Sequence, residues 1–328
     1  MASKNTTMKI IVTLLFFYEM CFCYKVFRNL KFENKGIISD IIPHCIHGVE
    51  SVSYFLYTRN KPYGEEIHTI NEYVPLRANR PVVFLIHGFT SEANNSNYFE
   101  LITVWLKKED INIFSLDWSS AACRGGFSLA DLLAYNSAVH NVPIVSKHLT
   151  NFVIKLVNKY GVNVNEISVI GHSLGAHVAG FSGKHVQQVF KQKYKQIIGL
   201  DPAGPEYNDK DCVNRLCQSD AALVQVFHTS RLAMHSAIGD NDFYFNGGNT
   251  QPGCILTVCS HSRAVIYFTM TLLHSPCFIG TAWRIGSDSI LKWEECNKDT
   301  CTFPTFGNIS KGTYYVNTTD TTPFCTLQ

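Results

Sequence analysis

The chain has 328 residues, of which 46% are hydrophobic and 16% are charged, and its formal net charge is +2. This length allows a large buried core and one or two domains. No basic stripe runs along the chain, which argues against nucleic acid as a partner and against strong electrostatic steering to anionic membranes.

Residues 1–23 have the pattern of a secretory signal peptide. Lys4 and Lys9 form a basic start, and the apolar region from Ile10 to Tyr18 is too short to span a bilayer. No later stretch is long and apolar enough to cross a membrane. We therefore expect a signal peptide at 1–23 and a secreted, extracellular protein. The length of the remaining chain is accounted for by a single domain over residues 24–328.

Apolar runs then predict strands that alternate with helices. Strands are expected at residues 53–58, 82–86, 111–116, 167–170, 196–200 and 222–229. Helices are expected at residues 98–107, from about Ser128 to Gly161 with a kink or a division at Pro143, and after Ser173. This alternation predicts an α/β protein with a mainly parallel sheet, whose site lies at the carboxyl ends of the strands.

Ten cysteines remain after the signal peptide. An even number in a secreted chain favours disulfides over free thiols, and the absence of a Cys-x-x-Cys pair argues against zinc. Three pairs are close in sequence, namely Cys212 with Cys217, Cys254 with Cys259, and Cys296 with Cys301. Spacing alone does not prove the connectivity.

The sequence Gly171-His172-Ser173-Leu174-Gly175 follows one of the predicted strands and precedes a predicted helix. A strand, a sharp turn and a helix in this order form a nucleophile elbow, in which the serine hydroxyl projects above the sheet. The two glycines leave room for the tight turn. Ser173 is therefore the candidate nucleophile.

A catalytic serine needs a base, and the base needs an acid that orients it. Asp201 directly follows the strand after the elbow, 28 residues beyond Ser173 (201 − 173), and Pro202 turns the chain away. Asp209, Asp211, Asp220, Asp240 and Asp242 are alternatives, but none of them follows an apolar strand so directly. A role for Asp201 as a helix or turn cap remains open.

The base is expected downstream of the acid, because the order in this kind of fold is Ser, Asp, His. His261 precedes the apolar run from Ala264 to Leu273, and we expect it in a loop that is fixed on both sides. The other candidates are His228, His235 and His274, of which His228 also fits a structural histidine at a strand end. His172 and His177 flank the serine, but the elbow is expected to turn them away from the base position.

Hydrolysis of an ester also needs N–H donors for the oxyanion of the tetrahedral intermediate. One donor is expected from Leu174, directly after the nucleophile. The other is expected from Phe89 in the loop His87-Gly88-Phe89, which follows the strand at residues 82–86.

From Val82 to about Cys277 the chain resembles the pancreatic-lipase family, and within it the insect venom phospholipases A1. The matching stretches are 87–90, 171–180, 199–205, 251–254 and 259–261. The resemblance implies an α/β-hydrolase fold, a Ser173–Asp201–His261 triad and oxyanion donors at Phe89 and Leu174. It also implies the disulfides Cys45–Cys123, Cys212–Cys217, Cys254–Cys259, Cys277–Cys325 and Cys296–Cys301.

Departures from typical triglyceride lipases in the family guide the expected substrate. The lid loop of such lipases lies between two cysteines, and here Cys254 and Cys259 enclose only Ile255, Leu256, Thr257 and Val258. The loop between Thr229 and Asp242 is also short. We further expect no C-terminal β-sandwich of the kind that binds colipase. By resemblance, this favours phospholipids at a membrane or micelle surface, cleaved at sn-1 by a monomer without colipase. The short apolar loop, Leu232, Met234 and Ile238 are candidates for contact with lipid or for simple packing.

No cofactor and no required metal are expected. Some lipases of this family hold a structural calcium after the aspartate strand, and Arg215 and Asp220 match that pattern, but Cys217 replaces an acidic ligand. The alternatives to a phospholipase A1 are a neutral lipase or galactolipase with the same triad, and a non-catalytic yolk or storage protein. Asn94, Asn308 and Asn317 are possible N-glycosylation sites in a secreted protein.

Overall fold

The computed structural model describes residues 45, 48–68, 73–123, 131–274, 277–283, 301–302, 304 and 310–325. The expected signal peptide at 1–23 lies outside the described residues. The described part of the chain contains one eleven-stranded sheet. Its strands are β1 (Ser53–Thr58), β2 (Lys61–Ile67), β3 (Val82–Ile86), β4 (Asn112–Asp117), β5 (Ile167–His172), β6 (Gln196–Leu200), β7 (Val224–His228), β8 (Asn241–Phe245), β9 (Gly280–Ala282), β10 (Cys301–Thr302) and β11 (Gly312–Val316).

The strand order is β10-β9-β11-β8-β7-β6-β5-β3-β4-β1-β2. The strands from β4 through β3, β5, β6, β7 and β8 to β11 run parallel. β1 and β2 add an antiparallel edge on one side, and β9 and β10 add one on the other. This is the mainly parallel sheet that the alternating pattern predicts.

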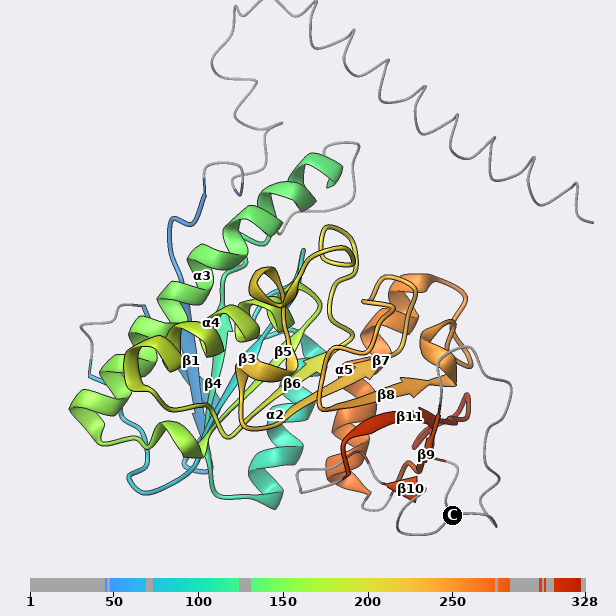
Figure 1. Ribbon diagram of the computed structural model, residues 1–328. Helices are drawn as coiled ribbons and strands as arrows, with labels where there is room; N and C mark the ends of the chain where they lie inside the picture. Colours follow the sequence, from blue (N-terminus) through green and yellow to red (C-terminus); the bar gives the residue numbers. More distant parts are fainter. Residues whose placement is uncertain are drawn as a thin grey trace, which may run out of the picture. The chain divides into compact units, whose positions relative to one another are not determined.

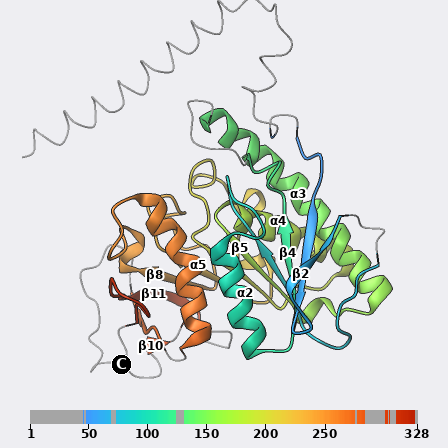
Figure 2. The same ribbon diagram turned by 180° about the vertical axis from the view of Figure 1, so that it is seen from behind.

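Helices cover both faces of this sheet. They are α2 (Ser96–Lys108), α3 (Asp131–Tyr160), α4 (Leu174–Phe190) and α5 (Thr257–Leu273), with short 3-10 helices η2 (Val164–Glu166), η3 (Cys212–Asn214), η4 (Gln218–Asp220) and η5 (Asn246–Gly248). α3 and α4 pack together on one face, and α2 and α5 pack together on the other (Figures 1 and 2). In β5, Val169 belongs to the α3–α4 core and Ile170 to the α2–α5 core, which explains why adjacent residues of this strand are both apolar.

The long helix α3 contains Pro143 near its middle, yet it continues for 30 residues. The expected division at Pro143 is therefore wrong. The helix is held by a buried stripe that continues on both sides of the proline and includes Val142, Val145 and Leu149, all fully buried. The packing of this stripe outweighs the one backbone hydrogen bond that proline removes.

The described residues after Cys277 continue the sheet rather than leaving it. β11 pairs with β8 in parallel and with β9 in antiparallel orientation, and the Cys277–Cys325 disulfide closes this region. Together with the elbow at the end of β5, this topology is that of an α/β-hydrolase fold, as expected. Among the described helices, none combines the length and the apolar character that crossing a membrane requires.

Candidate active site

Ser173 lies at the turn between β5 and α4, at the carboxyl edge of the sheet. Its φ of +56° is in the left-handed region that non-glycine residues rarely adopt, as expected for a nucleophile elbow. The turn closes tightly, because a Cβ on Gly171 would stand 2.3 Å from the carbonyl oxygen of Gly175. A Cβ on Gly88 would stand 2.7 Å from the Cβ of Ser173, so the neighbouring loop also needs glycine. The serine is 7% exposed.

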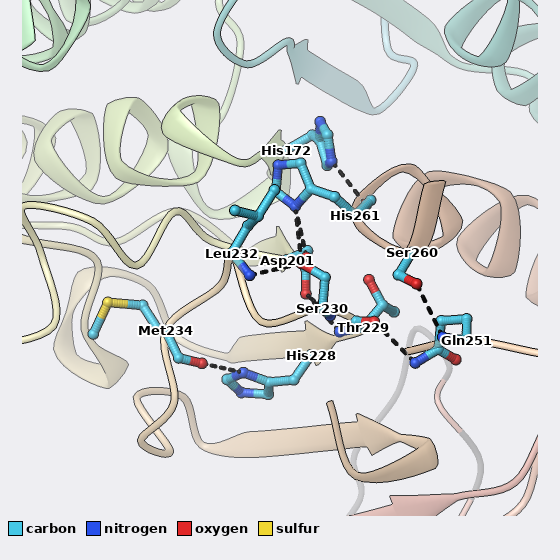
Figure 3. A network of polar contacts seen from close by, with 10 residues as sticks. All are labelled: His172, Asp201, His228, Thr229, Ser230, Leu232, Met234, Gln251, Ser260 and His261. Carbon is cyan, nitrogen blue, oxygen red and sulfur yellow. Dashed lines mark hydrogen bonds and ion pairs between the residues drawn. The ribbon is translucent and has the colours of Figure 1, made fainter. Parts of the chain in front are cut away.

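Asp201 and His261 are joined directly, although they are 60 residues apart in sequence. Nδ1 of His261 donates to Oδ2 of Asp201 at 2.6 Å (Figure 3). Asp201 follows β6 and is fully buried, whereas the His261 side chain is 14% exposed. This pairing leaves Nε2 of the imidazole to act on a proton outside the pair.

The carboxylate of Asp201 accepts further hydrogen bonds from the turn after β7. Oδ1 accepts from the backbone N–H of Thr229 at 2.5 Å and of Ser230 at 3.1 Å. Oδ2 accepts from the hydroxyl of Ser230 at 2.5 Å (Figure 3). These donors fix the plane of the carboxylate. The sequence analysis missed Ser230, whose only signal was its place directly after the strand 222–229.

His261 belongs to the beginning of α5, so the expected loop position is wrong. The helix begins at Thr257, within the loop that the Cys254–Cys259 disulfide closes. Ser173 and His261 line the same pocket. Among the described residues, no hydrogen bond joins the Ser173 hydroxyl to His261. Such contacts are often long in free enzymes and tighten when substrate binds.

The two expected oxyanion donors are both available. Leu174 is the first residue of α4, where a helix leaves its N–H without an intrahelical acceptor. The N–H of Phe89 has no acceptor among the described residues, although the next residue, Thr90, donates to Ala122. The loop is fixed by Trp118, whose indole N–H donates to the carbonyl of His87 at 2.9 Å.

Of the two histidines beside Ser173, His177 is fully buried and His172 is half-buried, and the pKa of each is lowered. Burial, followed by the neighbouring His261, lowers the pKa of His172 to about 3. His172 nevertheless lies against the catalytic pair: its Nε2 donates to the backbone carbonyl of His261 at 3.1 Å, and the two rings are 4.5 Å apart. His172 contacts the backbone of His261 rather than Asp201, and it is His261 that pairs with the carboxylate. Burial also lowers the pKa of His177 to about 3.

His228, one of the alternative bases, forms a separate structural pair. It is fully buried, and its ring contacts the carbonyl of Met234 at 3.0 Å (Figure 3). The ring also contacts Oδ1 of Asp242 at 2.8 Å. Both ring nitrogens are therefore used within the fold. Asp242, an alternative acid, is occupied by the same pair.

A pocket of about 560 Å³ opens beside Ser173. Its lining includes the apolar or aromatic residues Phe89, Tyr135, Pro205 and Leu232. It also includes polar residues such as Asn95, Asn97 and Ser262.

The short loop between the lid cysteines lies at the rim of this pocket. Val258 lines the pocket, while Ile255 and Leu256 are 97% and 65% exposed. Thr257 and Val258 already belong to α5. Met234 and Ile238 are buried in the core, so the suggestion that they contact lipid is wrong.

The structure contains four of the implied disulfides. They are Cys45–Cys123, Cys212–Cys217, Cys254–Cys259 and Cys277–Cys325. Cys296, the implied partner of Cys301, lies outside the described residues, as does Asn308. Asn94 and Asn317 are exposed.

Asp220, which matches a calcium-site pattern in the sequence, is paired with a side chain instead. Nζ of Lys184 donates to Oδ2 of Asp220 at 2.6 Å and to the carbonyl of Arg215 at 2.8 Å. Burial raises the pKa of Asp220 to about 6. No cluster of three or more potential metal ligands occurs among the residues that the structure describes.

Comparison with known proteins agrees with this architecture. Residues 46–324 match the family model described as Lipase. A protein named phospholipase A1 from Polybia paulista is 39% identical over 297 residues, which cover 87% of this chain and 92% of that protein. Phospholipase A1 1 from Polistes dominula is 36% identical, covering 92% and 93%, and phospholipase A1 from Vespula vulgaris is 35% identical, covering 98% and 97%. The chain belongs to the lipase family.

Proposed function

We propose that this protein is a secreted phospholipase A1, which hydrolyses the sn-1 acyl ester of phospholipids with Ser173, Asp201 and His261. The observation that carries the proposal is the 2.6 Å contact between His261 and Asp201, beside the pocket that contains Ser173. The relatives named phospholipase A1, at 35–39% identity over most of the chain, support the substrate class.

In the proposed mechanism, Nε2 of His261 takes the proton of the Ser173 hydroxyl as the oxygen attacks the sn-1 carbonyl. The N–H groups of Phe89 and Leu174 donate to the resulting oxyanion, and Asp201 stabilises the imidazolium. The intermediate collapses as His261 gives its proton to the departing glycerol oxygen, which leaves an acyl-enzyme on Ser173. Water, deprotonated by His261, then releases the fatty acid and restores the serine.

The pocket supports a lipid with a polar head. Its lining residues Tyr135, Pro205 and Leu232 suit contact with an acyl chain, and its lining residues Asn95 and Asn97 suit hydrogen bonds to a polar head. The exposed Ile255 and Leu256 at the rim suit contact with a membrane or micelle surface. We propose that the monomer acts there without colipase or a metal ion.

The secreted state is proposed from the sequence pattern at 1–23 and from the disulfides, which persist in oxidising compartments. Expression in insect cells with N-terminal sequencing of the protein in the medium tests it. The expected first residue is Tyr24, and retention of residues 1–23 in the medium would contradict the signal peptide.

The activity is tested with a phosphatidylcholine that carries different acyl chains at sn-1 and sn-2. The expected product is the sn-1 fatty acid, in EDTA as well as in calcium, with a Ser173→Ala variant as the inactive control. Release of only the sn-2 fatty acid would contradict the proposal. Parallel assays on emulsified triglyceride and on galactolipid test the two alternatives. A neutral lipase would hydrolyse the triglyceride faster than phosphatidylcholine, and a galactolipase would hydrolyse the galactolipid faster.

A further inference from the structure

Gln251 lies in one of the stretches that carry the family resemblance, yet no step of the proposed mechanism uses it. It stands between η5 and α5, three residues before Cys254. Its side chain is polar, but the residue is only 1% exposed. A buried amide is tolerated only when its hydrogen-bonding groups are satisfied, so its partners indicate what it holds together.

All four hydrogen-bonding positions of the Gln251 amide are occupied. Nε2 donates to the backbone carbonyl of Thr229 at 2.9 Å and to that of Phe245 at 2.7 Å. Oε1 accepts from Nδ2 of Asn246 at 2.8 Å and from the hydroxyl of Tyr267 at 3.2 Å. The amide thus connects the ends of β7 and β8 with the middle of α5.

The backbone of Gln251 makes a further connection to α5. Its N–H donates to the hydroxyl of Ser260 at 2.9 Å, and Ser260 directly precedes His261 (Figure 3). One residue therefore contacts both the helix that carries His261 and Thr229, whose N–H donates to Asp201.

We infer that Gln251 is a positioning residue that sets the turn holding Asp201 relative to the helix holding His261. The two catalytic residues come from different elements, and Gln251 bridges the supports of both. This inference rests on the proposed function, because it concerns the same triad. It assigns to the amide a role that neither an apolar nor an acidic side chain of similar size fills, since only the amide has two donors for the carbonyls of Thr229 and Phe245.

The test compares Gln251→Met with Gln196→Met, a matched control. Gln196 is also buried, at 4% exposure, and donates to Ser168 in the sheet. Hydrolysis of a soluble p-nitrophenyl ester excludes effects of lipid-surface binding. We expect Gln251→Met to lower kcat by about 10-fold to 100-fold, with KM changed less than twofold, because small displacements of catalytic groups have effects of this size. Gln196→Met is expected to keep kcat within twofold, even where both variants lower the melting temperature similarly.

A second variant keeps the inference testable if Gln251→Met does not fold. Ser260→Ala removes the acceptor of the Gln251 N–H, and it is compared with Ser182→Ala, a buried serine whose hydroxyl contacts Thr150 and Tyr194. Ser260→Ala is expected to lower kcat severalfold, and Ser182→Ala is not. Wild-type kcat in both Gln251→Met and Ser260→Ala, or equal losses in test and control variants, would overturn the inference.

A readout without substrate separates this inference from the proposed function. The proton on Nδ1 of His261, which is donated to Asp201, is followed by NMR as a low-field resonance. The resonance is assigned by its absence from the spectrum of the His261→Asn variant. In Gln251→Met the resonance is expected to shift upfield or broaden, and in Gln196→Met to remain. An unchanged resonance in Gln251→Met would overturn the positioning role, whereas an inactive wild-type protein would overturn only the proposed function.

Discussion

Gly175 and Ile86 are so close that no side chain fits between them. A Cβ on Gly175 would stand 2.3 Å from the backbone carbonyl oxygen of Ile86. This contact sets the distance between the first turn of α4 and the end of β3, and thereby the height of Ser173 above the sheet. The glycine is therefore required by the close approach of two backbones.

Replacing Gly175 with alanine is expected to displace the elbow. Because the contact is with backbone, which yields less than a side chain, the free energy of unfolding should fall by about 3 kcal/mol or more. Urea denaturation and kcat on a soluble ester measure the two effects. Gly161→Ala is the control, since a Cβ there meets nothing within 4 Å and its cost arises only from a φ of +70°. Equal losses in both variants would contradict the close-packing argument.

Ser230→Ala is expected to impair the catalytic pair without affecting substrate binding. The hydroxyl donates to the same Asp201 oxygen that accepts from His261, so its loss weakens the fixed orientation of the carboxylate. We expect kcat to fall by about 10-fold, within the range of one hydrogen bond to a charged group, and KM to stay constant. Ser230→Thr, which keeps a hydroxyl, should restore most of the activity. A wild-type kcat in Ser230→Ala would show that the backbone donors suffice.

The buried histidines predict how stability depends on pH. Because burial lowers the pKa of His177 to about 3 from 6.5, the unfolded chain binds a proton between these values that the folded chain does not. The stability due to this residue is therefore present above pH 6.5 and is lost as pH falls towards 3. Asp220 has the opposite effect, because its raised pKa of about 6 means that protonation below this pH favours the folded chain. The contribution of His177 is therefore isolated by comparing wild type with a variant.

The test compares wild type with His177→Gln by urea denaturation between pH 6 and pH 4. As pH falls, the free energy of unfolding should decrease more steeply for wild type than for the variant. The two slopes should differ by about 1.4 kcal/mol per pH unit, which corresponds to the one proton that His177 binds in the unfolded chain. Identical slopes in the two proteins would mean that His177 is protonated in the folded state.

The exposed loop between the lid cysteines predicts a selective effect on lipid surfaces. An Ile255→Ser, Leu256→Ser variant should bind phosphatidylcholine vesicles less tightly by about 30-fold or more, because two apolar side chains that enter the interface each contribute about 1 kcal/mol or more. Its activity on a soluble ester should not change. Val213→Ser in η3 is the control, since Val213 is 67% exposed but does not line the pocket. Equal losses of vesicle binding in both variants would refute a specific role for this loop.

Much of the sheet could be predicted because its central strands are buried on both faces. The runs 53–58, 82–86 and 196–200 coincide with β1, β3 and β6, whose residues are mostly apolar because side chains on both faces of these strands are buried. β8 and β11 were not predicted. β8 begins with Asn241 and Asp242, whose buried polar side chains find partners only in the folded chain, and this polar start hides the strand.

The residues of the candidate site that have their own local motif could be found in the sequence. Ser173 lies in its elbow, and Asp201 follows its strand. The helical position of His261 could not be predicted, because the helix starts inside a disulfide loop whose closure is a tertiary contact. Ser230 and Gln251 act only through partners that are distant in sequence, so no local pattern indicates their contacts.

The position of β11 has a consequence for how the protein is made. This strand completes the parallel part of the sheet beside β8, but it is synthesised 67 residues after β8 ends (312 − 245). Until then the apolar side chains that it covers, such as Phe243, remain open to water and to other chains. Cys277 must likewise wait for Cys325, 48 residues later, before their disulfide can form, so this side of the sheet is completed late in folding.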